Sequence, residues 1–125
     1  VNTDISVRRD KLAEFYHHAS DAIRTISNNC RICGYGHVGD GNLHFNVVEA
    51  EGGDPDWPQK RAPLLAAIYA SLSEFEGSIS AEHGIGQLKT DQLKHTKDAE
   101  YYRIMTQIKN TFDPKKLLNP NRIIK

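Results

Sequence analysis

The stretch that most constrains this chain is residues 34–46, with the sequence Gly-Tyr-Gly-His-Val-Gly-Asp-Gly-Asn-Leu-His-Phe-Asn. Four glycines fall within its first eight residues, and apolar residues that favour β-strands lie on both sides. Alternating side chains predict one strand over residues 30–37 and another over residues 43–48, and the Gly-Asp-Gly at 39–41 supplies a turn. The stretch is therefore predicted to be a β-hairpin.

The hairpin carries two histidines, His37 and His44. A hairpin pairs residues that are equidistant from its turn, so we expect these two nearly opposite each other, about 5 Å apart at Cβ. Two imidazoles at that separation can share one metal ion, which then needs a third ligand, preferably a carboxylate. Glu82, in the segment Ser-Ala-Glu-His-Gly-Ile-Gly, is the candidate. The alternative is that both histidines are ordinary residues of a solvated hairpin.

A set of two histidines and one glutamate fits Zn²⁺ best, although Mn²⁺, Fe²⁺ and Co²⁺ accept the same kinds of ligand. Asn46 lies two residues beyond His44 and therefore on the same strand face, so its amide can reach a ligand at the metal. The alternative for Asn46 is a half-buried polar strand residue. Asp40 is interpreted as a turn former, because Asp-Gly is a common turn pair.

The segments around the hairpin alternate between strand and helix. From the apolar spacing we expect a strand at 4–8, helices at 11–27 and 58–76, a strand at 78–81, helices at 86–93 and 99–112, and an irregular tail at 117–125. Asp10 is the expected N-cap of the first helix, and Pro63 should kink the second or mark its true start. The order β-α-β-β-α-β predicts an α+β, ferredoxin-like antiparallel sheet with helices on one face, followed by a C-terminal helical segment and tail.

The composition of the chain argues against some classes of function. The chain has 125 residues, enough for one domain, and equal numbers of basic and acidic residues (16 each), which argues against nucleic acid as a partner. No apolar run approaches about 20 residues, so no transmembrane helix is expected. The first residue is Val1 rather than Met, and we interpret the chain as a fragment of a longer protein.

Cys30 and Cys33 form a C-x-x-C pair without the sequence context of a thioredoxin-like site or a second C-x-x-C for zinc. In a strand these two residues point to opposite faces, so we expect two separate packed or partly exposed thiols. Reduced thiols without a disulfide framework suit a cytoplasmic protein.

Three motifs carry a resemblance to a known family. They are G-H-V-G-D-G-N-L-H-F-N from residue 36, S-A-E-H-G-I-G-x-x-K from residue 80, and D-P-K-x-L-L-N-P ending at residue 120. In this order they resemble the C-terminal domain of FAD-linked oxidases, flavoproteins of the vanillyl-alcohol-oxidase type. That group includes D-lactate dehydrogenase, the flavin subunit of glycolate oxidase and D-2-hydroxyglutarate dehydrogenase. The resemblance covers essentially the whole chain, so residues 1–125 are expected to form this one domain.

The resemblance implies an FAD-dependent oxidoreductase that oxidises a small D-2-hydroxy acid, such as D-lactate or glycolate, to the 2-oxo acid. FAD would be bound mainly by a separate N-terminal domain, because this chain has no Gly-rich dinucleotide fingerprint. The further partners implied are the hydroxy acid and an electron acceptor, and the chain by itself is expected to be inactive. A homodimer is possible.

The resemblance also implies roles for individual residues. His37, His44 and Glu82 match the metal ligands of members that have a metal site. His83 matches a histidine thought to take the hydroxyl proton of the substrate while the C2 hydride goes to flavin; the alternative is that it caps or packs under the following helix.

Four further residues match the family near the flavin. Gly84 and Gly86 would let the backbone pass close to the cofactor, Lys89 matches a lysine about one turn into a helix, and Asn119 belongs to an N-P that runs back towards the flavin domain. The alternatives are a plain strand-to-helix turn, a solvated surface lysine and a generic Asn-Pro turn. Asn2 departs from the family, because some hydroxyglutarate-specific members carry a lysine there, which puts that substrate in doubt.

Two other classes of function remain open from the residues alone. A stand-alone metallohydrolase would use the metal to activate water and would need no flavin. A metal-free ferredoxin-like interaction module would dimerise through its sheet and would tolerate substitution of His37.

Overall fold

The computed structural model describes residues 1–124, which divide into two compact units. Unit 1 extends from Val1 to Glu82, and unit 2 begins at His83. Unit 1 contains the sheet and its two covering helices, whereas the secondary structure assigned in unit 2 is helical. Among the described residues, no helix is both long and apolar enough to cross a membrane.

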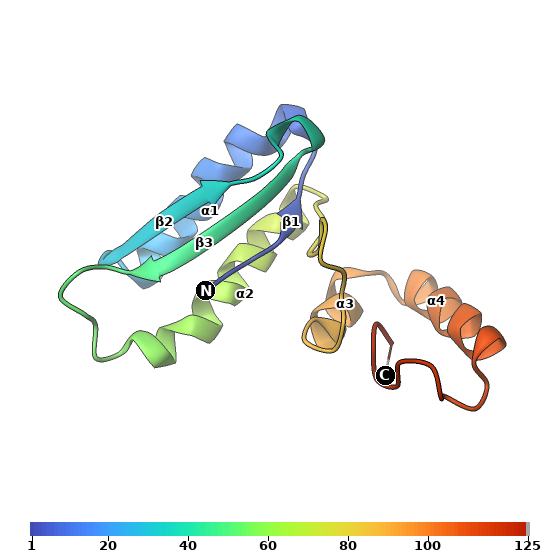
Figure 1. Ribbon diagram of the computed structural model, residues 1–125. Helices are drawn as coiled ribbons and strands as arrows, with labels where there is room; N and C mark the ends of the chain where they lie inside the picture. The colour runs from blue at the N-terminus through green and yellow to red at the C-terminus, as the bar shows by residue number, and fades with distance from the viewer. Residues whose placement is uncertain (125) are drawn as a thin grey trace. The chain divides into compact units, whose positions relative to one another are not determined.

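Unit 1 is built on a three-stranded antiparallel sheet in the order β1-β3-β2. The strands are β1 (Ile5–Ser6), β2 (Cys30–Tyr35) and β3 (Asn42–Glu49). Helices α1 (Leu12–Ile26) and α2 (Trp57–Glu74) lie together on one face of the sheet (Figure 1). The predicted α+β fold with helices on one face is therefore confirmed.

The core of unit 1 lies between the sheet and the two helices. Alternation along β3 turns Leu43, Phe45 and Val47 towards the helices, and all three are buried. The helices contribute buried residues at helical spacing: Phe15, Ala19 and Ile23 from α1, and Leu64, Ile68 and Leu72 from α2. The rings of Phe15 and Phe45 meet edge to face at 5.9 Å. This packing leaves the other side chains of β3, including His44 and Asn46, on the opposite face of the sheet.

The hairpin forms as predicted, but its register differs. β2 ends at Tyr35, and it is Tyr35, not His37, that pairs with His44. Gly36 leaves the strand with φ +147°, and residues Val38–Asp40 then form a short 3₁₀ turn. His37 thus lies outside the strand at the start of that turn, so the prediction that the two histidines lie opposite each other in the hairpin is wrong.

The first two helices begin differently from the sequence prediction. Asp10 does not cap α1: it lies in a 3₁₀ turn, Arg9–Lys11, and its carboxylate pairs with Arg8 at 2.8 Å. α2 begins at Trp57, so Pro63 lies inside the helix and does not mark its start. The predicted strand at 78–81 is reduced to a single bridge between Ser6 and Ser78.

Unit 2 contains α3 (Thr90–Thr96) and α4 (Ala99–Phe112). α4 has the predicted bounds, and Asp98 caps it by accepting a hydrogen bond from the Tyr101 N–H at 2.7 Å. α3 begins four residues later than predicted, because Gly84 and Gly86 have left-handed φ angles of +75° and +55°, which a right-handed helix does not allow. Between Asp113 and Ile124 the structure assigns no helix or strand, as predicted for the tail.

Candidate metal and substrate site

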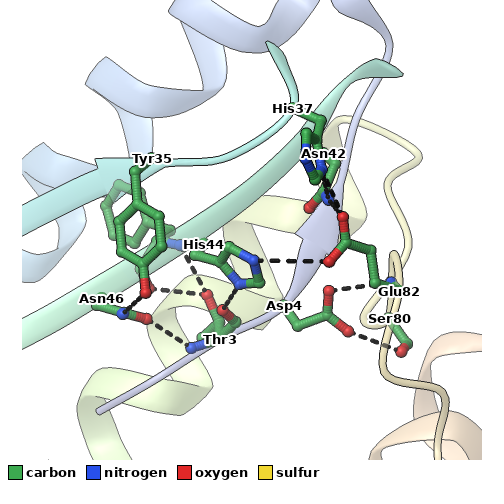
Figure 2. Close-up of polar contacts among 10 residues, drawn as sticks. Thr3, Asp4, Tyr35, His37, Asn42, His44, Asn46, Ser80 and Glu82 are labelled. Atoms are coloured by element: carbon green, nitrogen blue, oxygen red, sulfur yellow. Dashed lines mark hydrogen bonds and ion pairs between the residues drawn. The ribbon is translucent and has the colours of Figure 1, made fainter. Parts of the chain in front are cut away.

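Glu82 lies between the two histidines (Figure 2). His37 Nδ1 is 2.6 Å from Glu82 Oε1, and His44 Nε2 is 3.9 Å from Oε2. The two imidazoles therefore face the two oxygens of one carboxylate, although they are not cross-strand neighbours. The turn that takes His37 out of the strand is what lets it reach Glu82.

The backbone selects the tautomer of His44. Its Nδ1 lies 3.2 Å from the carbonyl oxygen of Thr3, and a carbonyl oxygen only accepts hydrogen bonds, so Nδ1 carries the hydrogen. In the neutral ring the lone pair is then on Nε2, the atom that faces Glu82. A hydrogen bond from the second ring nitrogen to a carbonyl is the usual support of a metal-binding histidine.

The donor set fits a divalent metal ion. Two imidazole nitrogens and a carboxylate are ligands that Zn²⁺ accepts, and three protein ligands leave a position open for substrate. The exposed fractions of the side chains fall from 69% at His37 to 38% at Glu82 and 16% at His44, so the cluster opens to solvent on the His37 side. Asp4 also lies close: one possible ligand atom each from Asp4, His44 and Glu82 lie within 4.8 Å of one another, and His37 is not a member of that group.

Asn42 and Asp4 hold Glu82 from its two ends. The amide nitrogen of Asn42 donates to Glu82 Oε1 at 2.5 Å and also lies 3.3 Å from His37 Nδ1. Asp4 is buried immediately before β1 and accepts hydrogen bonds from the Glu82 N–H and the Ser80 hydroxyl, each at 3.0 Å. Burial, and secondly the negative charge of Asp4, raise the pKa of Tyr69 on α2.

Asn46 and Tyr35 extend the site along the face of the sheet opposite the helices. The Asn46 side chain is fixed at both ends: its Oδ1 accepts from the Thr3 N–H at 3.0 Å, and its Nδ2 donates to the Tyr35 hydroxyl at 3.2 Å. The Tyr35 ring lies 5.0 Å from the His44 ring, and Tyr35 is 57% exposed. Because the Tyr35 oxygen accepts from Asn46, its own hydrogen remains available to donate to a bound ligand.

Sequence reasoning missed Asp4, Tyr35 and Asn42 as members of this site. Asn42 could have been found, since Asn42, His44 and Asn46 alternate along one strand and share a face. Tyr35 required the true register, and Asp4 required the pairing of β1 with a strand nearly forty residues away.

The remaining predicted residues lie in unit 2, where Gly84, Gly86 and Asn119 line one groove of about 460 Å³. The groove also has Phe112, Arg122 and Ile123 in its wall. Lys89 directly precedes α3 and is not one turn inside a helix, contrary to the prediction. His83 is the first residue of unit 2 and is exposed.

The two cysteines are free thiols, as predicted. Cys33 pairs with Asn46 across the strands and so lies on the same face of the sheet, three residues from Cys30 on the other face. Cys30 donates to the carbonyl oxygen of Ser27 at 3.2 Å, and burial raises the pKa of its thiol. Nothing in this arrangement forms a redox pair.

The chain is an α+β domain in which two histidines lie beside one carboxylate, and comparison with known proteins identifies its family. The chain matches the family "FAD linked oxidases, C-terminal domain" over residues 1–123, and it belongs to that family. The resemblance found in the sequence is thus confirmed.

The chain is similar to curated dehydrogenases of D-2-hydroxy acids. It is 38% identical to mitochondrial D-2-hydroxyglutarate dehydrogenase of Arabidopsis thaliana over 112 residues (89% of this chain, 19% of the relative). Against D-lactate dehydrogenase of Anaerostipes hadrus it is 35% identical over 120 residues (96% and 25%). Against mitochondrial D-2-hydroxyglutarate dehydrogenase of Danio rerio it is 38% identical over 125 residues (97% and 22%). The chain therefore spans about a fifth to a quarter of the length of these relatives.

Proposed function

We propose that this chain is the substrate- and metal-binding domain of an FAD-dependent dehydrogenase that oxidises a small D-2-hydroxy acid to the 2-oxo acid. The observation that carries the proposal is the carboxylate of Glu82 flanked by His37 and His44, in a chain of the FAD-linked oxidase family. Residues 1–125 would work as one C-terminal domain together with an N-terminal domain that binds most of the FAD. The free thiols support a reducing compartment such as the cytoplasm.

His37, His44 and Glu82 would hold a divalent ion, with Zn²⁺ the best match to this ligand set. Such an ion supplies Lewis-acid polarisation, which lowers the pKa of a coordinated hydroxyl group. Glu82 would contribute one negative charge and the two imidazoles would be neutral donors, so a divalent ion with these three ligands would keep a net positive charge towards a hydroxy-carboxylate. Thr3 and Asn42 orient the ligands through the contacts described above.

The other residues would bind and orient the substrate. Asn46 and Tyr35 present N–H and O–H donors on the same face of the sheet as His44, which suits a carboxylate. His83 would take the hydroxyl proton as general base, a role that histidine fills more often than other residues. FAD supplies the hydride acceptor, and Gly84, Gly86, Lys89 and Asn119 are the residues proposed to lie against it.

The substrate is proposed to be a short monocarboxylate such as D-lactate or glycolate. Asn2 is exposed and neutral where a lysine would favour a second, distal carboxylate. The relatives include dehydrogenases named for both D-lactate and D-2-hydroxyglutarate. Comparing these two substrates therefore tests the assignment directly.

The test is steady-state kinetics of the flavoprotein formed by this chain and its FAD-binding domain, with an artificial electron acceptor. We expect D-lactate or glycolate to be oxidised with a higher kcat/KM than D-2-hydroxyglutarate. His83→Gln should lower kcat at least about 100-fold, the usual contribution of a general base, while His95→Gln on α3 should leave it unchanged.

Two results would contradict the proposal. One is full activity of His83→Gln or preference for the L-enantiomer. The other is metal-dependent hydrolysis by the 125-residue chain without flavin, which would identify a metallohydrolase instead.

A further inference from the structure

We propose that Asp4 is a positioning residue that holds Glu82 in place between His37 and His44. The proposal rests on the metal site of the proposed function, but the contacts that carry it belong to the protein alone. Asp4 is 3% exposed and comes from the other end of unit 1, 78 residues before Glu82. Asp4, immediately before β1, is thus hydrogen-bonded to the last residue of unit 1.

The hydrogen bonds of Asp4 are directed at the Glu82 segment. Its Oδ1 accepts from the backbone N–H of Glu82 at 3.0 Å, and its Oδ2 accepts from the hydroxyl of Ser80 at 3.0 Å. A carboxylate is rarely buried unless its oxygens are paired, and bonds to an ionised acceptor are roughly twice as strong as neutral ones. Asp4 therefore holds the segment at two points, the side chain of Ser80 and the backbone of Glu82, the residue that supplies the carboxylate.

The strand explains why Asp4 reaches the site. In β1, Ile5 pairs with Leu43 of β3, and both side chains are buried under the helices. Asp4 precedes Ile5, so its side chain lies on the opposite face, the face of His44. Figure 2 shows Asp4 below Glu82, with Ser80 beside it and His44 on the other side.

Regular secondary structure does not extend to Glu82 in the described residues. The last regular pairing of this segment with the sheet is the bridge between Ser6 and Ser78, four residues earlier. Beyond it the chain has no assigned strand or helix until α3. Asn42 holds the Glu82 side chain, and Asp4 holds its backbone. If Asp4 releases the backbone, we expect the carboxylate to lose its fixed distance to both imidazoles.

The test uses the complete 125-residue chain and compares Asp4→Asn and Ser80→Ala with the wild type. The control, Asp21→Asn, removes an equal charge from an exposed position on α1, where the Asp21 side chain is 81% exposed. Two quantities are measured: hydrogen exchange of the Glu82 amide by NMR in the absence of metal, and the dissociation constant for Zn²⁺ by competition with a chelating dye.

We expect Asp4→Asn to speed exchange of the Glu82 amide and to weaken Zn²⁺ binding about 10- to 100-fold, the usual effect of losing a residue that supports a metal ligand. Ser80→Ala should weaken binding about 2- to 10-fold, consistent with one lost hydrogen bond. Asp21→Asn should change neither quantity. Should Asp4→Asn fail to fold, as judged by circular dichroism, the exchange rate and the Zn²⁺ affinity of Ser80→Ala are compared with those of the wild type.

Each alternative result is decisive. Weaker Zn²⁺ binding with unchanged exchange at Glu82 would show that Asp4 acts as a ligand or only through its charge, which overturns the positioning role. Unchanged exchange and unchanged affinity would overturn it as well. Faster exchange in a chain that binds no Zn²⁺ even as wild type would support the anchoring of Glu82 and count against the metal part of the proposed function.

Discussion

At Glu82, contacts from two distant parts of the sequence meet on one side chain and its backbone. His37, Asn42 and His44 come from the hairpin, and Asp4 immediately precedes the first strand. The positions of these residues in the sequence do not indicate that they contact Glu82, because the contacts depend on which strands pair. The site is therefore best tested by removing one contact at a time.

Asn42→Ala removes the amide that donates to the Glu82 carboxylate. We expect Zn²⁺ affinity to fall about 10-fold, because the freed carboxylate loses its fixed orientation, and stability to fall by about 1–2 kcal/mol, because Asn42 is buried. The measurements are a competition titration and urea unfolding. Asn110→Ala, at an exposed position of α4, is the control. Unchanged affinity in Asn42→Ala would show that Asn42 does not orient the ligand.

Tyr35→Phe keeps the ring beside His44 and removes the hydroxyl. In the flavoprotein we expect KM for the hydroxy acid to rise about 10-fold with kcat changed less than about 3-fold, because a binding contact is lost and the metal ligands remain. Tyr101→Phe, exposed on α4, should have no effect. A fall in kcat with KM unchanged would instead place Tyr35 in the chemical step.

The hairpin turn contains one glycine that its conformation requires and one that it does not. Gly41 has φ +73°, and a Cβ there would meet the carbonyl oxygen of Val7. Gly39, two residues earlier in the same turn, has nothing within 4 Å of an added Cβ. The two glycines form a matched pair, because one is required by the fold and the other is not.

Gly41→Ala is therefore expected to lower the free energy of unfolding by about 2–4 kcal/mol, from backbone strain together with the clash. Gly39→Ala should change it by less than about 0.5 kcal/mol. Denaturant unfolding of both variants measures the difference. Equal effects in the two variants would mean that the turn does not have the conformation described.

An element could be predicted from the sequence where its pattern of residues repeats along that element itself. β3 and α4 could be predicted because their apolar residues recur at a fixed period over eight or more residues. The start of α3 could not, because two glycines in a left-handed conformation delay the helix, and apolar spacing does not report φ. The register of the hairpin failed for a similar reason: Gly36 leaves the strand early, so His37 reaches Glu82 from the turn and not from the ladder.

Because the chain divides into two compact units, we expect unit 1 to fold without unit 2. Of the buried hydrophobic residues described, all lie in residues 1–82 except Leu93 and Ile124. A chain ending at residue 84 retains this core together with His37, His44 and Glu82. We expect it to unfold in one cooperative thermal transition, followed by circular dichroism at 222 nm, since a shared core makes small domains two-state. A broad, non-cooperative loss of signal would contradict the independence of unit 1.

We propose that His37, His44 and Glu82 hold one divalent metal ion. The most direct test is metal content by mass spectrometry of the purified 125-residue chain, after loading with Zn²⁺ and dialysis. We predict close to one ion per chain for the wild type and for His17→Ala, an exposed position on α1, and loss of the ion in His44→Ala and Glu82→Gln. A wild type without metal, or metal retained in both site variants, would contradict the claim.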